Sequence, residues 1–449
     1  MRRHPVVALS AVIGLLLLPE ALAAQSPAPP QPALSEILPR LYESVINGEV
    51  DALDGFSSDV LRARIDAASQ INNRLASQLS SFPLVSSAGG FTWRFAPVSG
   101  TFTRASDSFG PIFADRALTI GRNRANFGVN FQRVTFDRLE GKALRDGEIL
   151  GYSGIPVYLS DRNDFGVFFQ DALSLQASAT TVSVFATYGA SDRFDIGLAV
   201  PINQVSIRAS LTSVYGNSID GVAPVTSVPG CNPPPLPTEC TPVPETIVGQ
   251  SSGTAVGLGD VVVRAKYNFL PAPGGGLAGA VDLRLPTGDE RNLLGSGGAQ
   301  AKMYLIASTT ANRVSPHVNV GYTVSGESDA ARDPRSSVIA PPNEINYAGG
   351  GDIVVSLRTT ATLDVVGRRL LKAGALVEGP TRFLKGTSGA RYQELQLTPG
   401  VDVNLLLGSV GVRMNPVANM LVAVNVLFPL TQRGLTDRLT WLVGADYSF

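Results

Sequence analysis

The chain has 449 residues and is close to neutral, with 36 basic side chains against 37 acidic ones. This balance gives no reason to expect a nucleic acid or another strongly charged partner. The 2 histidines and 2 cysteines are too few for an ordinary zinc site, and no glycine-rich phosphate loop opens a helix, so no metal or cofactor is expected.

Residues 1–24 have the pattern of a signal peptide. Arg2 and Arg3 precede an apolar run from Val6 to Leu18, and a cleavage site with small residues follows at 21–23. The run is shorter than the roughly 20 residues of a membrane-spanning helix, so an uncleaved anchor is the less favoured interpretation. We therefore expect the chain to be exported.

Residues 25–34 form a Pro-rich linker, and residues 35–82 follow it as an amphipathic helical segment with a break near Asn47. Its apolar stripe contains Leu61, Ile65, Ala68, Leu75 and Leu79. The stripe predicts packing against the rest of the protein, with a coiled-coil oligomerisation segment as the alternative.

Residues 83–123 mix aromatic side chains with arginines ahead of the first clear strand. We expect this segment to fold back as a plug that involves Trp93, Arg94, Arg116 and Arg122. The alternatives are a periplasmic hairpin beside the mouth of the strand structure, or an additional strand pair.

From residue 124 to residue 449 the chain is a series of alternating segments, which predicts an all-β fold. Twelve segments can be marked, the tenth over 395–405 and the last over 439–449. Every second side chain is apolar. The opposite faces carry charges and one histidine, which are candidate lumen-lining residues: Arg264, Lys266, Asp282, Arg284, Lys302, His317, Asp364, Arg368, Glu394, Asp402, Arg438 and Asp446.

The lengths of the connections distinguish a membrane barrel from a soluble sandwich. They alternate between short turns, such as 189–194, and long loops, such as 210–255, as in outer-membrane barrels. A sheet can cross hydrocarbon only if it closes and leaves no unpaired edge. We therefore expect an antiparallel transmembrane β-barrel of about twelve strands, or fourteen if residues 83–123 add a pair. Cys231 and Cys240 are expected to form one local disulfide in the longest loop.

Three stretches, 257–269, 281–298 and 316–326, together resemble the outer-membrane family named for the meta-pathway of phenol degradation. The resemblance covers roughly residues 177–449. It implies a barrel that passes aromatic or other hydrophobic compounds. The end of the chain, with Tyr447 and Phe449, resembles the C-terminal aromatic signature recognised by the bacterial barrel-assembly machinery.

The expected function is passive transport of small hydrophobic or aromatic compounds across the bacterial outer membrane, with lipid and solute as further partners. The inward charges are close to balanced, which argues against strong ion selectivity and also fits a structural ion-pair ladder. A surface-binding or structural role that uses the loop 215–250 is the alternative. An outer-membrane hydrolase is less favoured, because His317 is the only histidine beyond the signal peptide and would need a Ser or Asp partner. We therefore expect no enzyme activity.

Overall fold

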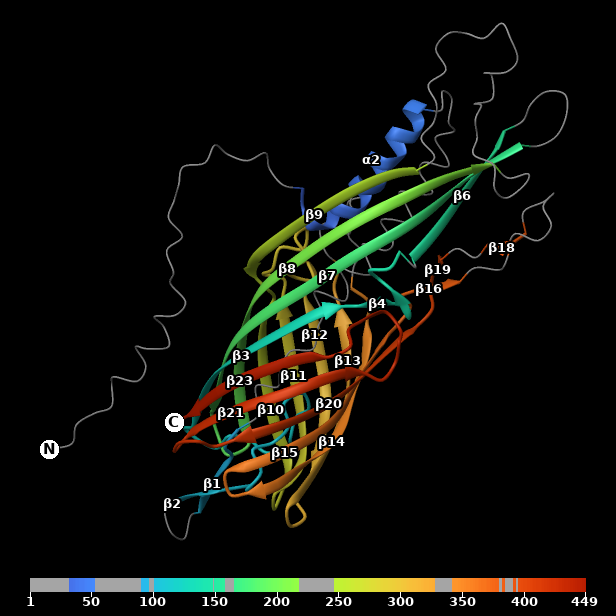
Figure 1. Ribbon diagram of the computed structural model, residues 1–449. Coiled ribbons are helices and arrows are strands. Elements are labelled where there is room, and N and C mark those ends of the chain that lie inside the picture. The colour runs from blue at the N-terminus through green and yellow to red at the C-terminus, as the bar shows by residue number, and fades with distance from the viewer. Residues whose placement is uncertain are drawn as a thin grey trace, which may run out of the picture. The chain divides into compact units, whose positions relative to one another are not determined.

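Twelve antiparallel strands close into a barrel (Figure 1). In order around the wall they are β3 (Ala125–Phe136), β7 (Phe165–Gly189), β8 (Phe194–Asn217), β10 (Val261–Ala272), β11 (Gly275–Leu285), β12 (Gln300–Ser308), β13 (Val314–Ser325), β14 (Glu344–Ser356), β15 (Thr359–Leu370), β20 (Val403–Met414), β21 (Met420–Pro429) and β23 (Thr440–Ser448). The last strand pairs with β3, which completes the ring. The predicted barrel of twelve strands is confirmed.

The computed structural model describes residues 32–52, 90–96, 101–147, 149–157, 165–217, 246–327, 341–378, 382–383, 391–392 and 395–449. Residues 33–449 form one unit. The predicted signal peptide, both cysteines and the predicted helical stripe at 61–79 lie outside the described residues. No helix in the described part of the chain combines the length and apolar character needed to span a membrane.

Short turns join the strands at one end of the barrel, and long loops join them at the other. At the turn end, for example, residues 190–193 connect β7 to β8, and residues 357–358 connect β14 to β15. The loop end includes the connections 286–299 and 371–402. The chain finishes at the turn end, where the amide of Phe449 donates to the carbonyl oxygen of Ala125. The difference between the two ends is that of an outer-membrane barrel.

The outer face of the wall is apolar, as the alternation predicts. Val129, Leu305 and Trp441 are about half exposed, at 46%, 58% and 56%. Between them on the same strands lie inward polar side chains such as Asn130 and Thr440. No other part of the described chain covers this belt, and an exposed apolar belt of this kind is typical of a membrane barrel.

The strands β7 and β8 continue past the barrel wall as a four-stranded extension (Figure 1). The strand β6 (Ile149–Val157) pairs with the far half of β7, and β9 (Thr246–Leu258) pairs with the far half of β8. The apolar face reverses where the extension begins. The registered row Phe131, Val182, Ile202 and Leu258 belongs to the outward belt, whereas the nearby row Val134, Ala179, Val205 and Ala255 faces inward.

This reversal marks the depth at which the wall leaves lipid. On β8 the outward apolar side chains run from Phe194 to Ile202, and this length matches the roughly 9–11 residues of a membrane-crossing strand. Beyond Ile202 the buried side chains are Val205, Ile207 and Leu211, on the inward face. The outward face is there occupied by polar residues such as Arg208, as expected for contact with water.

The N-terminal helix packs on the inward face of the extension. A 3₁₀ turn, η1 (Leu34–Glu36), leads into α2 (Ile37–Ala52). Its apolar stripe, Ile37, Leu38, Leu41, Tyr42 and Val45, is buried against β8 and β9. The helix approaches closely because β9 presents glycines there. A Cβ atom at Gly253 would lie 2.8 Å from Ile37 Cδ1, and one at Gly249 would lie 2.6 Å from Val45 Cγ2.

The tenth strand differs from its predicted range. The wall strand is β20 (Val403–Met414), and Val403 faces inward and is buried, whereas an apolar side chain in the predicted segment 395–405 is expected to point outward. The outward side chains are Val410, Val412 and Met414. The prediction failed because Leu405, Leu406 and Leu407 are consecutive, so hydrophobicity alone does not define which face points out. Residues 395–398 form β19, which pairs with β16 (Ala375–Glu378) outside the barrel wall.

The remaining short strands lie at the two ends of the barrel. At the loop end, β4 (Arg138–Leu139) pairs with β5 (Lys142–Ala143) and with β22 (Leu435–Thr436), and β17 (Arg382–Phe383) pairs with β18 (Arg391–Tyr392). A hairpin of β1 (Trp93–Ala96) and β2 (Thr101–Arg104) precedes the first wall strand.

Candidate functional site in the barrel interior

Residues 105–123, here called the inner segment, run through the barrel interior between β2 and β3. Three of their apolar side chains, Phe109, Ile112 and Ala117, are fully buried. They pack against inward side chains of different strands, such as Leu421 for Phe109 and Ile306 for Ala117. The inner segment therefore touches several parts of the wall.

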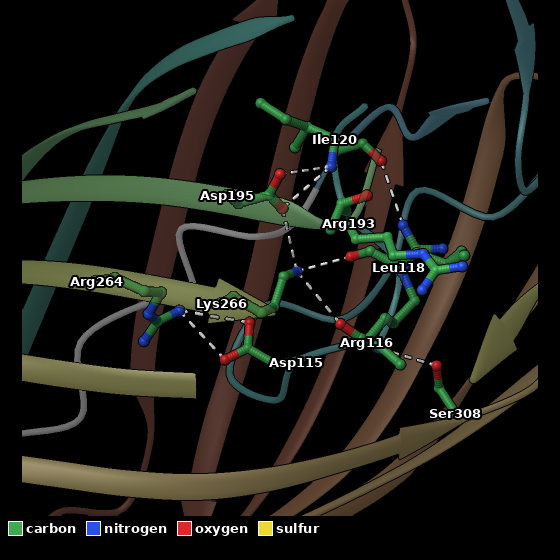
Figure 2. Close-up of polar contacts among 12 residues, drawn as sticks. Asp115, Arg116, Leu118, Ile120, Arg193, Asp195, Arg264, Lys266 and Ser308 are labelled. Atoms are coloured by element: carbon green, nitrogen blue, oxygen red, sulfur yellow. Dashed lines mark hydrogen bonds and ion pairs between the residues drawn. The ribbon is translucent and has the colours of Figure 1, made fainter. Parts of the chain in front are cut away.

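Lys266 and Asp195 hold the middle of the inner segment (Figure 2). The ammonium of Lys266 donates to the carbonyl oxygen of Leu118 at 2.7 Å and to that of Arg116 at 3.4 Å. The carboxylate of Asp195 lies 3.6 Å from the ammonium and accepts the amide of Ile120 at 3.1 Å. Both side chains are almost completely buried, so these charge-assisted bonds are shielded from water.

Asp115 provides a second attachment. Its carboxylate accepts from Arg264 Nη1 at 3.2 Å (Figure 2). The same carboxylate accepts from the Tyr304 hydroxyl at 2.9 Å. Its backbone amide donates to Asn319 Oδ1 at 2.8 Å, and Asn319 Nδ2 donates back to its carbonyl oxygen at 3.0 Å. Arg264 also forms a bidentate pair with Asp282, with both distances at 2.6 Å.

Further bonds bind the backbone of the inner segment to the wall. Arg413 Nη1 donates to the carbonyl oxygen of Phe109 at 3.0 Å, and the amide of Phe109 donates to Thr360 Oγ1 at 3.2 Å. The amide of Ala117 donates to Ser308 Oγ at 3.0 Å. The wall thus recognises the backbone of the inner segment more than its side chains.

Arg116 stabilises the inner segment through hydrogen bonds to nearby backbone groups. Its guanidinium donates to the carbonyl oxygens of Ser108 at 3.0 Å and of Gly90 at 3.3 Å. Burial lowers the pKa of Arg116 to about 10, so the side chain is still a cation at neutral pH. Gly110, with φ +78°, permits this packing, because a Cβ atom there would lie 2.6 Å from Arg116 Nε.

A cavity of about 140 Å³ lies beside the inner segment, against β8 and the strands from β10 to β15. Phe113, Val262 and Val366 give it apolar walls. Its charged lining consists of Asp115, Arg264, Asp282, Arg284, Lys302, Glu344 and Arg368. Arg368 forms an ion pair with Glu344.

Nine of the predicted lumen-lining residues are on inward positions of the wall strands: Arg264, Lys266, Asp282, Arg284, Lys302, His317, Asp364, Arg368 and Asp446. Asp402 and Arg438 are not. Asp402 lies in the loop before β20 and pairs with Arg369 at 2.8 Å, and the side chain of Arg438 is 83% exposed at the loop end. Glu394 lies outside the described residues.

The four predicted plug residues occupy different places. Arg116 is buried in the inner segment, whereas Arg122 is half exposed and pairs with Asp192 in a short turn. Trp93 and Arg94 belong to the β1–β2 hairpin, and Arg94 Nη2 donates to the carbonyl oxygen of Ala272 at the turn end.

Asp115, Tyr304 and Glu344 were not predicted as site residues. Tyr304 and Glu344 occupy inward positions of their strands, so alternation could have identified them. Asp115 lies in a segment without periodicity, and no sequence signal indicates its partners.

His317 forms a buried hydrogen bond to Asp364, with 2.7 Å between Nε2 and Oδ1. Among the described residues, no hydroxyl group bonds to either ring nitrogen, and this differs from the arrangement of a Ser-His-Asp triad. The described residues also contain no group of three or more His, Cys, Asp or Glu that could hold a metal ion.

The fold and the interior define the class: a transmembrane β-barrel whose interior contains a segment of its own chain. No family model and no curated protein sequence matches the chain. Among solved structures, it is similar to an outer membrane channel from Pseudomonas putida F1, with TM-score 0.41, 12% identity, and coverage of 74% of this chain and 98% of that one.

Two further similar structures are a Pseudomonas aeruginosa FadL homologue and the Ralstonia pickettii toluene transporter TbuX. The first has a TM-score of 0.32 and 14% identity and covers 82% of this chain and 96% of its own. The second has a TM-score of 0.30 and 11% identity and covers 83% of this chain and 99% of its own. The function is therefore argued from the geometry of this chain.

Proposed function

We propose that the protein is a passive outer-membrane channel for small hydrophobic or aromatic compounds. The observation that carries the proposal is a cavity inside a closed, lipid-facing wall, with apolar sides formed by Phe113, Val262 and Val366. Its volume of about 140 Å³ is close to that of engineered cavities, roughly 150 Å³, that bind benzene. A single aromatic ring is therefore the size of solute that it suits.

We further propose that the inner segment is the plug of this channel. A barrel of twelve strands is intermediate between barrels filled by side chains and barrels with an open aqueous pore. The inner segment is held by hydrogen bonds, an ion pair and small apolar contacts, and among the described residues its continuation into β3 is its only covalent link to the wall. Passage of a solute then requires part of the inner segment to shift.

A reversible crosslink tests the plug. The amide nitrogen of Ala117 lies 3.0 Å from Ser308 Oγ, so the two positions are close enough for a disulfide to be engineered between them. In planar bilayers, the oxidised Ala117→Cys/Ser308→Cys variant is expected to conduct less than the wild type, and dithiothreitol is expected to restore its conductance. The single variants Ala117→Cys and Ser308→Cys, which keep the native Cys231 and Cys240 as the double variant does, are the controls for reduction of the native pair.

If the oxidised and reduced double variants conduct equally, the inner segment does not act as a plug. If the wild type neither conducts nor admits aromatic solutes into vesicles, the channel itself is contradicted. The same proposal includes export through the signal peptide and residence in outer-membrane lipid. It also includes insertion by the barrel-assembly machinery through the strand ending at Phe449.

A further inference from the structure

Lys302 is the one cavity cation for which the described residues offer neither a hydrogen bond nor an ion pair. It projects inward from β12, next to Asp282 across the sheet. Both oxygens of Asp282 are already bound by Arg264, at 2.6 Å each. The contact that remains for the Lys302 ammonium is the face of the Tyr304 ring, with 4.7 Å to the ring centroid.

The three carboxylates of the cavity are already bound by other side chains. Asp115 is bound by Arg264 and the Tyr304 hydroxyl, and Glu344 is bound by Arg368. The lining holds four cations and three carboxylates, so it carries a net positive charge. An ammonium that faces a cavity and has no hydrogen bond or ion pair within the described residues favours an anionic ligand there, because a bound anion offsets the cost of keeping that charge away from bulk water.

We infer that the cavity is a binding site for small aromatic carboxylates, whose carboxylate is bound by Lys302 and whose ring packs against the apolar sides. This inference deepens the proposed channel function and rests on it. The volume of about 140 Å³ fits one ring, and Phe113 and Val366 provide the apolar contact. The site adds a charge requirement to the hydrophobic selection expected from the sequence.

Binding is tested on the full-length mature protein in detergent, with benzoate as the probe and benzyl alcohol as its neutral counterpart. Isothermal titration calorimetry is carried out on the wild type, Lys302→Met, Lys302→Arg and the control Arg313→Gln, which changes an exposed cation in a short turn. Lys302→Met keeps the length of the side chain and removes its charge. Folding of each variant is verified by its heat-modifiable mobility in electrophoresis.

We expect Lys302→Met to weaken benzoate binding at least tenfold, as expected for the loss of a hydrogen bond between charged groups. The benzoate affinities of Lys302→Arg and Arg313→Gln should stay within about threefold of the wild-type affinity, because both variants keep a cation at position 302. Benzyl alcohol binding should not depend on residue 302. Equal affinity of the wild type for the two probes, or unchanged benzoate binding in Lys302→Met, overturns the site.

Reversal potentials in a sodium benzoate gradient separate this site from the proposed channel. The wild type should favour benzoate over sodium, and Lys302→Met should shift the potential toward sodium. A bilayer that conducts but shows no such shift contradicts the role of the site in selection and leaves the channel intact. A silent bilayer contradicts the channel, and the calorimetry still decides whether the site binds benzoate.

Discussion

Replacing Lys266 with Met should release the middle of the inner segment from the wall. The substitution removes the donor to the carbonyl oxygens of Leu118 and Arg116, and it leaves the buried carboxylate of Asp195 without its cation. Breaking one side of a buried ion pair costs about 3–5 kcal/mol. Since 1.4 kcal/mol is a factor of ten, even about 3 kcal/mol raises the open fraction of the inner segment more than roughly a hundredfold.

Hydrogen exchange measured by mass spectrometry reports this opening directly. The amide of Ile120 is bonded to Asp195, so peptides that cover 115–121 should exchange faster in Lys266→Met by a factor of roughly a hundred. Peptides from β9, in the extension, should exchange as in the wild type.

The matched control is the double variant Lys266→Met/Asp195→Asn. It keeps an oxygen acceptor for the Ile120 amide and removes the uncompensated charge, so it should exchange more slowly than Lys266→Met. Unchanged exchange of residues 115–121 in a folded Lys266→Met protein would refute the view that these bonds hold the inner segment.

Two further predictions concern the wall and the extension. Gly253→Val should displace α2 and reduce the free energy of unfolding by about 1–3 kcal/mol through overpacking. Limited proteolysis of residues 33–45 should detect the displacement. Ser252→Val, on the outward face of β9, should leave the helix protected. Val184→Arg should destabilise the protein folded in lipid vesicles by about 2–4 kcal/mol, measured by urea titration. Ser178→Arg should change this stability little, because the chain has left the membrane at residue 178. Equal costs for the two variants would contradict this position of the membrane boundary.

The barrel was predictable because most wall strands alternate between an apolar outward side chain and a polar inward one. On β11, for example, Val281, Leu283 and Leu285 face lipid while Asp282 and Arg284 face the interior. A period of two in both hydrophobicity and charge therefore identifies the strand and its orientation.

The extension was not predicted, although the sequence contains a pattern that indicates it. On β8 the apolar residues occupy even positions up to Ile202 and odd positions from Val205 onward. This change of parity without a break in the strand reports the passage from lipid to water, where the apolar face turns from outward to inward. Alternation alone does not state on which side of the sheet the solvent lies.

The partners of the inner segment could not be predicted from sequence. Lys266 and Asp195 were both on the polar face, but they bind backbone groups of residues 116–120, and any sequence offers such groups. Asp115 depends on contacts with Arg264 and Tyr304, which lie about 150 and 190 residues away along the chain. Only the closed wall brings these groups together.

The central claim is that the outward apolar face meets lipid up to the reversal of polarity and water beyond it. Nitroxide labels on β7 at positions 176, 178, 182 and 184 test it in proteoliposomes, by comparing collisions with oxygen and with a water-soluble nickel chelate. We expect high oxygen and low nickel accessibility at Val182 and Val184, and the opposite at Gln176 and Ser178. Nickel accessibility that is equally high at all four positions would contradict it.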